Sequence, residues 1–154
     1  MAPDPPPECV ILVGLPGAGK TTFYGQRLAT THEHISKDLF PHATDRQARQ
    51  NARLREALGA GRSVAVDNTN VSAAERASVI TIAREFGARV VGWYIEASTR
   101  EAVARNERRE GSGKVPKVAI FTCAKRLVPP RMEEGFDELH RVRVREDGTF
   151  EECV

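Results

Sequence analysis

Short runs of apolar residues alternate along this chain with longer and more polar segments. Residues 9–13 form one such run, which ends at Gly14 and is typical of a buried strand. Because strands and helices alternate throughout, we expect parallel strand pairing and an α/β layered architecture. The pattern predicts strands over residues 9–13, 34–36, 64–66, 89–95 and 139–144, and helices over residues 20–29, 44–59, 72–86, 98–109 and 116–127.

Three of the predicted helices begin with a Ser or Thr that is followed three residues later by Glu or Gln. This spacing is typical of a capping box, in which each side chain satisfies a backbone N–H that the first helical turn leaves free. The three pairs are Thr44 with Gln47, Ser72 with Glu75, and Ser98 with Glu101.

The length and composition indicate one globular domain. The chain has 154 residues, and we expect one domain over residues 9–154 after a proline-rich, disordered tail over residues 1–8. No segment approaches the roughly 20 apolar residues that span a bilayer, and the first residues have no apolar core of a secretory signal. The three cysteines are too few and too widely spaced for a disulfide framework or a zinc site. We therefore expect a cytoplasmic protein that does not contact a membrane.

A glycine-rich segment follows the first predicted strand and precedes the first predicted helix. Residues 14–21 fit the pattern G-x-x-x-x-G-K-[ST] at every fixed position. The glycines let backbone N–H groups approach phosphate oxygens, the helix N-terminus favours an anion, and Lys20 adds a full positive charge. The Thr21 hydroxyl can bind Mg²⁺. We expect a nucleoside triphosphate, ATP or another, to bind with Mg²⁺ at this P-loop, through Gly14, Pro16, Gly17, Ala18, Gly19, Lys20, Thr21 and Thr22.

Two acidic residues follow later predicted strands. Because ligands of open α/β sheets bind beyond the carboxyl ends of the strands, Asp38 should face the same crevice as the P-loop. There it could accept the proton of an attacking hydroxyl, or it could simply cap a helix. Asp67 ends the third strand, where an acidic residue often organises Mg²⁺, although the Asn-rich sequence after it also suits a turn.

Positive charge is concentrated near the end of the chain. Residues 100–131 contain nine Lys and Arg against three Glu, a balance of +6, whereas the whole chain carries +2. Arg108 and Arg109 precede a break at residues 111–113 that contains two glycines, which is the layout of a mobile lid over phosphates. The alternative is a solvated helix face, on which Arg105 would pair with Glu101.

Four segments follow one another along the chain: the P-loop with Phe23, the Ile-Ser-Lys-Asp segment ending at Asp38, the Asp-Asn-Thr-Asn segment at 67–70 and the arginine-rich segment at 105–109. In this order they resemble the kinase domain of polynucleotide 5′-kinases. The resemblance implies a P-loop kinase fold with a mostly parallel five-stranded sheet, ATP with Mg²⁺, and a 5′-OH end of DNA or RNA as acceptor. By the same resemblance, Lys20, Asp38 and Arg109 are catalytic, Thr21 and Asp67 bind the metal, and Arg109 also contacts the nucleotide. It further implies that Asn70 and Arg76 bind the acceptor, to which Arg46 and Arg49 are added below.

The sequence departs from this family in one position of the acceptor site. One branch of the family has an arginine three residues after the catalytic aspartate, but this chain has Pro41, so we expect Arg46 or Arg49 to replace it. No phosphatase or ligase segment is present, which predicts a free-standing kinase. Two alternatives remain open: a kinase of a small-molecule or nucleotide-sugar hydroxyl, and an ATPase switch. Asp38 argues against the switch, because a hydrolase would more commonly position water with Gln or Glu.

Overall fold

A single six-stranded sheet forms the centre of the molecule. The computed structural model describes residues 5–109 and 114–153. The strand order is β2-β3-β1-β4-β5-β6, with five parallel strands and β6 antiparallel at one edge. The strands are β1 (Glu8–Val13), β2 (Glu33–Ile35), β3 (Val64–Asp67), β4 (Arg89–Ile95), β5 (Glu138–Val144) and β6 (Phe150–Glu152).

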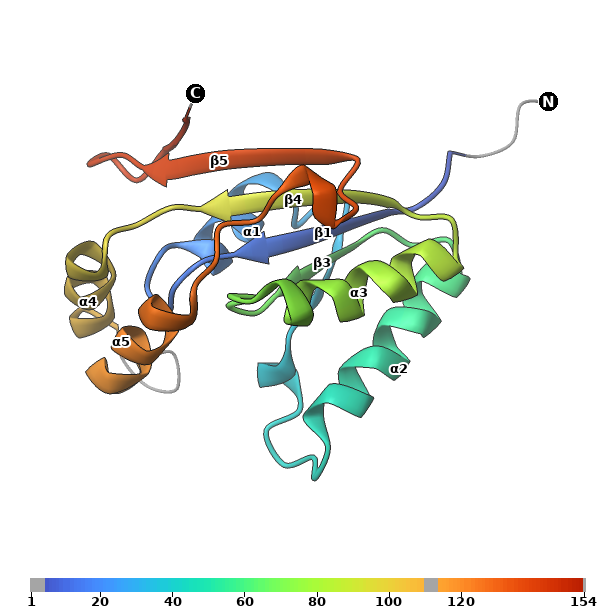
Figure 1. Cartoon of the computed structure of the whole chain (residues 1–154), viewed down its shortest axis with the longest axis horizontal. Coiled ribbons are helices and arrows are strands. Elements are labelled where there is room, and N and C mark those ends of the chain that lie inside the picture. The colour runs from blue at the N-terminus through green and yellow to red at the C-terminus, as the bar shows by residue number, and fades with distance from the viewer. Residues whose placement is uncertain (1–4, 110–113, 154) are drawn as a thin grey trace.

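Five α-helices of the described residues pack around the sheet, and Figure 1 shows α3 in front of it with α1 behind. The predicted α/β architecture with a mostly parallel sheet is thus confirmed, and the sixth strand adds to the five expected. Strand β6 lies in a segment after residue 144 for which the sequence pattern predicted no strand. The helices are α1 (Lys20–Arg27), α2 (Arg46–Gly59), α3 (Ala73–Glu85), α4 (Thr99–Glu107) and α5 (Lys117–Arg126), and short 3₁₀ turns occur at η1 (Lys37–Leu39) and η3 (Met132–Glu134).

The three predicted capping boxes have different outcomes. Ser98 forms the complete box with Glu101 at the start of α4. Ser72 accepts the N–H of Glu75 as predicted, but the Glu75 carboxylate accepts from Val71 instead of closing the box. The prediction for Thr44 is wrong, because α2 begins one residue later and Asp45 is its N-cap. A carboxylate at that position accepts the N–H of N3 directly, so the hydroxyl before it is not needed.

The residues of β1 alternate between two apolar cores, one on each face of the sheet. Cys9, Ile11 and Val13 pack with α2 and α3, whereas Val10 and Leu12 pack toward α1, α4 and α5. All five are fully buried, and an aliphatic side chain buried in this way contributes about 1.5–3 kcal/mol. This explains why residues 9–13 read as a continuous apolar run and not as an alternating one.

The first strand begins within the segment that was expected to be a disordered tail, residues 1–8. Residues 1–4 lie outside the described part of the chain, but Glu8 already belongs to β1, one residue earlier than expected. The carbonyl of Pro7 accepts the N–H of Arg89 at 2.9 Å, so ordered pairing begins just before the strand. In the described residues, no helix is both long and apolar enough to cross a bilayer.

The parallel order brings four connections to the same edge of the sheet. The loop after β1, η1 after β2, the turn after β3 and α4 after β4 all follow the carboxyl ends of neighbouring strands. The order of the strands changes sides at β1, because β2 and β3 lie on one side of it and β4 and β5 on the other, all parallel to it. Ligands of open α/β sheets bind at this kind of switch point.

Candidate nucleotide-binding and phosphotransfer site

The loop between β1 and α1 has the backbone that a phosphate cradle needs. Gly17 and Gly19 adopt φ angles of 84° and 109°, in the region that favours glycine. A Cβ on Gly17 would also collide with the carbonyl oxygen of Ala102 in α4. Glycine at 17 is therefore required both by its own conformation and by the close approach of α4.

Lys20 is buried at the start of α1 and points back into this loop. Its Nζ donates to the carbonyl oxygens of Gly14 and Leu15, at 3.0 and 2.9 Å. Burial lowers the pKa of Lys20 to about 8, so the side chain still carries its charge at neutral pH. The loop thus holds a desolvated ammonium group where an anion would be strongly attracted.

Thr21 and Asp67 meet directly, although 46 residues separate them. The Thr21 hydroxyl donates to Asp67 Oδ2 at 2.9 Å, and His34 Nε2 lies 2.8 Å from the same oxygen. Burial alone would raise the pKa of the Asp67 carboxyl, but the hydrogen bonds from His34 and Thr21 and the nearby Lys20 charge hold it below its ordinary value. Asp67 is therefore a carboxylate within the site.

This hydroxyl and carboxylate form a donor set that suits Mg²⁺. Mg²⁺ prefers oxygen ligands and usually takes one or two from the protein, with water and phosphate oxygens completing the shell. The described residues contain no group of three or more His, Cys, Asp or Glu side chains that could hold a metal by themselves. The residues present thus fit a metal shared with a bound nucleotide.

Asp38 lies on η1, and neighbouring elements fix the turn that carries it. Ser36 accepts the Asp38 N–H at 3.2 Å, and Asn68, after β3, accepts the Lys37 N–H at 3.0 Å. The Asp38 side chain is 92% exposed, and its Oδ1 lies 3.0 Å from Arg46 Nη2. Ser36, not Asp38, is the cap of this turn. The Asp38 carboxylate thus remains turned to solvent while Arg46 holds its direction.

These groups line one cavity of about 530 Å³. It brings together eight of the residues that the sequence assigned to the site: Pro16, Lys20, Thr21, Asp38, Arg46, Asp67, Asn70 and Arg109. His34, Gln50 and Glu75 also line the cavity and were not predicted.

Two predicted acceptor residues lie elsewhere. Arg49 does not line this cavity, and its guanidinium lies 5.7 Å from the centre of the Phe40 ring. Arg76 is fully buried, and it binds the Glu134 carboxylate through Nε and Nη2 at 2.7 and 3.0 Å. Its Nη1 donates to the Asn70 carbonyl at 2.9 Å. The prediction that Arg76 contacts the acceptor is therefore wrong, because the arginine is already bound within the core.

Asn70 is held rigidly at the edge of the cavity. Its φ angle is 47°, and its Nδ2 donates to the Leu12 carbonyl at 2.7 Å. The side chain thereby ties the turn after β3 to β1, which leaves little of it for an acceptor.

The predicted lid is anchored at both of its ends. Asn106, which is buried at the end of α4, donates through Nδ2 to the Val115 carbonyl at 2.6 Å and accepts the Val115 N–H at 2.9 Å. Arg109 lines the cavity and acts electrostatically on Lys20. The glycine break at residues 111–113 lies outside the described residues.

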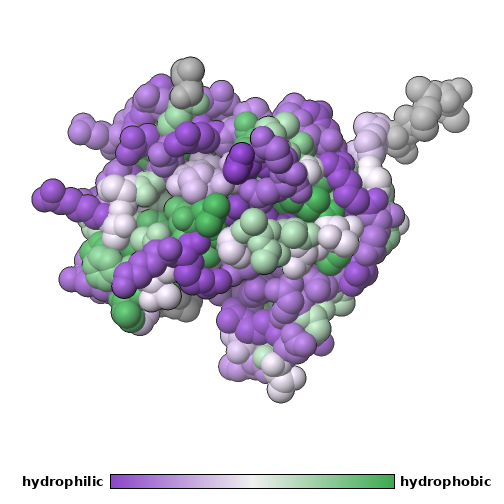
Figure 2. All heavy atoms as spheres, viewed as in Figure 1, coloured by the Kyte–Doolittle hydropathy of each residue, from purple (hydrophilic) through white to green (hydrophobic). Residues whose placement is uncertain are grey.

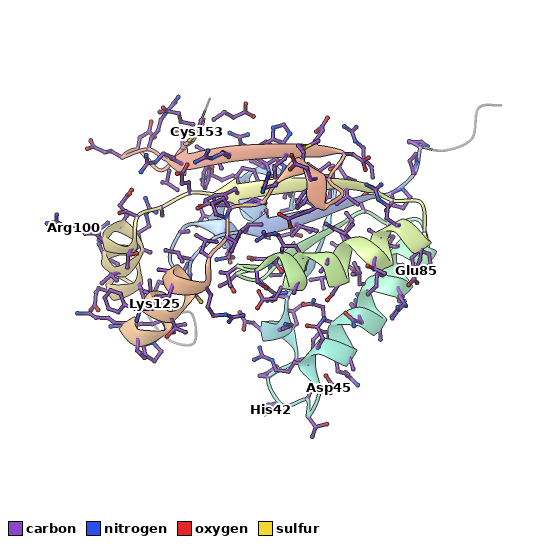
Figure 3. All side chains as sticks on the ribbon, viewed as in Figure 1. His42, Asp45, Glu85, Arg100, Lys125 and Cys153 are labelled. Carbon is purple, nitrogen blue, oxygen red and sulfur yellow. The ribbon has the colours of Figure 1, made fainter. Side chains whose placement is uncertain are left out.

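The basic segment is more extensively paired than its sequence suggests. Arg105 lies 3.9 Å from Glu101, as the alternative of a solvated helix face predicted, yet it also donates to the Ala18 carbonyl of the P-loop at 3.2 Å. Figure 3 shows Arg100 projecting away from α4. Further ion pairs join Lys114 and Lys117 to Glu107, Arg126 to Glu75, and Arg131 to Glu133. Only part of the +6 charge is thus left for a ligand.

The fold and this cavity define a P-loop kinase. Residues 9–130 match the family model described as AAA domain (AAA_33), and the chain belongs to that family.

Curated relatives that match most of this chain are polynucleotide phosphatase/kinases. The bifunctional polynucleotide phosphatase/kinase of Schizosaccharomyces pombe is 29% identical over 139 residues, which are 88% of this chain and 33% of that protein. The chain spans about a third of the length of the curated relatives it matches. These matches confirm the resemblance to polynucleotide kinases that the sequence motifs indicated.

Solved structures share the fold. A chain of the Pnkp1/Rnl/Hen1 RNA repair complex is 26% identical with a TM-score of 0.66, over 79% of this chain and 44% of that one. A gluconokinase from Sinorhizobium meliloti 1021 is 20% identical with a TM-score of 0.62, over 90% of this chain and 83% of that one.

Proposed function

We propose that this protein is an ATP-dependent polynucleotide 5′-hydroxyl kinase, which transfers the γ-phosphate of ATP to 5′-OH ends of DNA or RNA. The observation that carries the proposal is the exposed carboxylate of Asp38, held by Arg46, in the same cavity as Lys20 and Thr21. The named relatives support a nucleic-acid acceptor.

In this reaction the acceptor oxygen forms a bond to the γ-phosphorus as the bond from phosphorus to the β,γ-bridging oxygen breaks. Asp38 accepts the proton that the 5′-hydroxyl loses, and ADP leaves with the bridging oxygen. The P-loop N–H groups and Lys20 bind the phosphates, and Arg109 stabilises the charge on the transferred group. A Mg²⁺ ion held by Thr21 and Asp67 would neutralise phosphate charge.

The test is transfer of radiolabelled γ-phosphate to 5′-OH oligonucleotides, with the 5′-phosphorylated oligonucleotide as the matched control. We expect label on the 5′-OH strand alone. Because each phosphate contact releases counterions, the acceptor KM should rise with salt, with a slope of about 0.7 per contact for a single strand. Absence of transfer to every 5′-OH end, at any salt concentration, would contradict the proposal.

A kinase of a small-molecule hydroxyl is the second candidate. The observation that favours it is the extent of the gluconokinase match, which covers 83% of that chain. A small neutral acceptor such as a sugar or nucleoside would show almost no dependence of KM on salt, so the same salt series separates the two functions. An ATPase switch would instead release phosphate to water without any acceptor.

A further inference from the structure

A second hollow, of about 540 Å³, adjoins the candidate site. Its walls are formed by residues 39–49, here called the arm, which comprise the loop after η1 and the first turn of α2. Figure 1 shows the arm projecting from the body of the molecule, and Figure 3 places His42 and Asp45 at its tip. In Figure 2 a notch separates the arm from the part of the molecule that contains α4 and α5. The hollow is lined by Leu39, Phe40, Pro41, His42, Ala43, Thr44, Asp45, Ala48 and Arg49.

The two hollows share one lining residue. Leu39 lines both of them, and it directly follows Asp38. On α2, Arg46 lines the first hollow and Arg49 the second, and residues three apart are neighbours on a helix surface. Two neighbouring cations of α2 therefore line the two hollows, with Arg46 beside Asp38 in the first and Arg49 in the second. A strand with one phosphate per nucleotide matches such a repeat.

The second hollow also offers an aromatic and an apolar surface. Phe40 is half-buried beneath Arg49, whose guanidinium lies 5.7 Å from the ring centre, and Leu39 is 51% exposed. Further along α2, Arg53 and Arg55 form ion pairs with glutamates, but Arg49 forms none within the described residues. The one acidic residue that lines the hollow is Asp45, and its Oδ1 accepts the Ala48 N–H.

We infer that this hollow binds the second nucleotide of the acceptor strand, with its base against Phe40 and Leu39 and its phosphate near Arg49. The inference rests on the proposed function and adds a subsite to it. An acceptor whose 5′-hydroxyl lies at Asp38 must leave the first hollow, and Leu39 lies on its way into the second. Aromatic stacking tolerates every base, so the subsite would hold a strand without selecting its sequence.

The first experiment uses the unaltered protein and two 5′-OH oligonucleotides, one complete and one abasic at the second nucleotide. Loss of one stacked base is expected to raise the acceptor KM about 5- to 100-fold and to leave the KM for ATP unchanged. A matched oligonucleotide that is abasic at its sixth nucleotide should behave like the complete strand. Equal KM values for all three strands would overturn the inference.

The second experiment assigns the effect to the arm. Phe40→Ala should raise the acceptor KM for the complete strand by the same factor and should add nothing for the strand that is abasic at the second nucleotide. Arg49→Gln should reduce the slope of log KM against log salt by about 0.7, the value of one phosphate contact. Phe86→Ala and Arg55→Gln, which change an exposed aromatic residue and an exposed arginine outside both hollows, serve as controls.

The outcomes separate the inference from the proposed function. Phosphorylation of 5′-OH strands with no dependence on the second base would overturn the subsite alone. A penalty from Phe40→Ala that is equal for complete and abasic strands would also overturn it, because the ring would then act only on folding or on the first hollow. Failure to phosphorylate any strand would overturn both.

Discussion

At the scale of single residues, Asp38 combines high exposure with a charged partner. Ser36 accepts its backbone N–H and fixes the turn, and Arg46 contacts one carboxylate oxygen, while the carboxylate stays open to a hydroxyl. This is the state that a general base needs before its substrate arrives.

Asp38→Asn should therefore lower kcat by roughly 10²–10⁴-fold and leave ATP binding intact, because the amide keeps the shape but cannot accept the proton. The measurement is steady-state phosphate transfer together with ATP titration. Glu56→Gln, which removes an exposed carboxylate on α2 away from the cavity, is the control. A fully active asparagine variant would make Asp38 a structural residue.

Lys20→Ala should reduce transfer by about 10²–10³-fold, because it removes a charged donor from a desolvated site. Lys125→Ala, on α5, removes an equal charge outside the cavity and should have no such effect. Single-turnover transfer rates at saturating ATP report the difference. Near-normal rates in the Lys20 variant would remove the P-loop from the mechanism.

The sequence predicted the parts of the site that are fixed by local spacing. The P-loop could be found because its residues are contiguous and each has a separate chemical reason. His34 was not predicted as a site residue. It lies 33 residues from Asp67 in the sequence, and the two meet only because β2 pairs with β3. Arg76 was misassigned for the same reason, because its partner Glu134 lies 58 residues further on.

At the scale of elements, α4 is the part that connects the P-loop to the predicted lid. Arg105 donates to Ala18 of the P-loop, and Ala102 packs so closely on Gly17 that no side chain fits there. Arg109 follows α4 directly and lines the cavity, whereas Arg108 is exposed.

Arg109→Ala should consequently slow turnover far more than Arg108→Ala, by up to about 10³–10⁵-fold if the arginine contacts the transferred phosphate. The two substitutions remove the same charge one residue apart, so each is the control for the other. Comparison of kcat for both variants decides the matter. Small and equal effects would show that the pair is only a solvated helix end.

At the scale of the whole molecule, Arg76 and Glu134 join α3 to the turn before β5. Arg76 is fully buried, and the Glu134 side chain is 16% exposed. Removal of one partner from a buried ion pair leaves an uncompensated charge, whereas removal of both together is often tolerated.

Arg76→Met should thus destabilise the protein by about 3–5 kcal/mol, and Arg76→Met with Glu134→Gln should recover much of that loss. Denaturant unfolding of both single variants and the double variant measures the coupling. The folded fraction of each variant should keep the acceptor KM of the unaltered protein. A raised acceptor KM without a loss of stability would restore Arg76 to the acceptor site.

The alternation of apolar runs and polar helices predicted most of the fold, but it did not predict the edge strand β6. Strand β6 has three residues, of which only Phe150 is buried, so its composition carries no apolar run. Phe150 is held by an edge contact with Phe23, with ring centres 5.1 Å apart, from a helix more than a hundred residues earlier. Such a strand is specified by a tertiary contact that no local pattern contains.

The central position of β1 has a consequence for how the chain is made. Both of its neighbours, β3 and β4, come later in the sequence, and pairing on the second side is complete only when Tyr94 has been added. At about 5–20 residues per second, the ribosome finishes β1 roughly 4–16 s before its last partner. During that interval β1 can pair at most with β3, so five apolar residues that end up fully buried still lack a complete sheet around them, and exposed apolar segments of this kind are what chaperones bind.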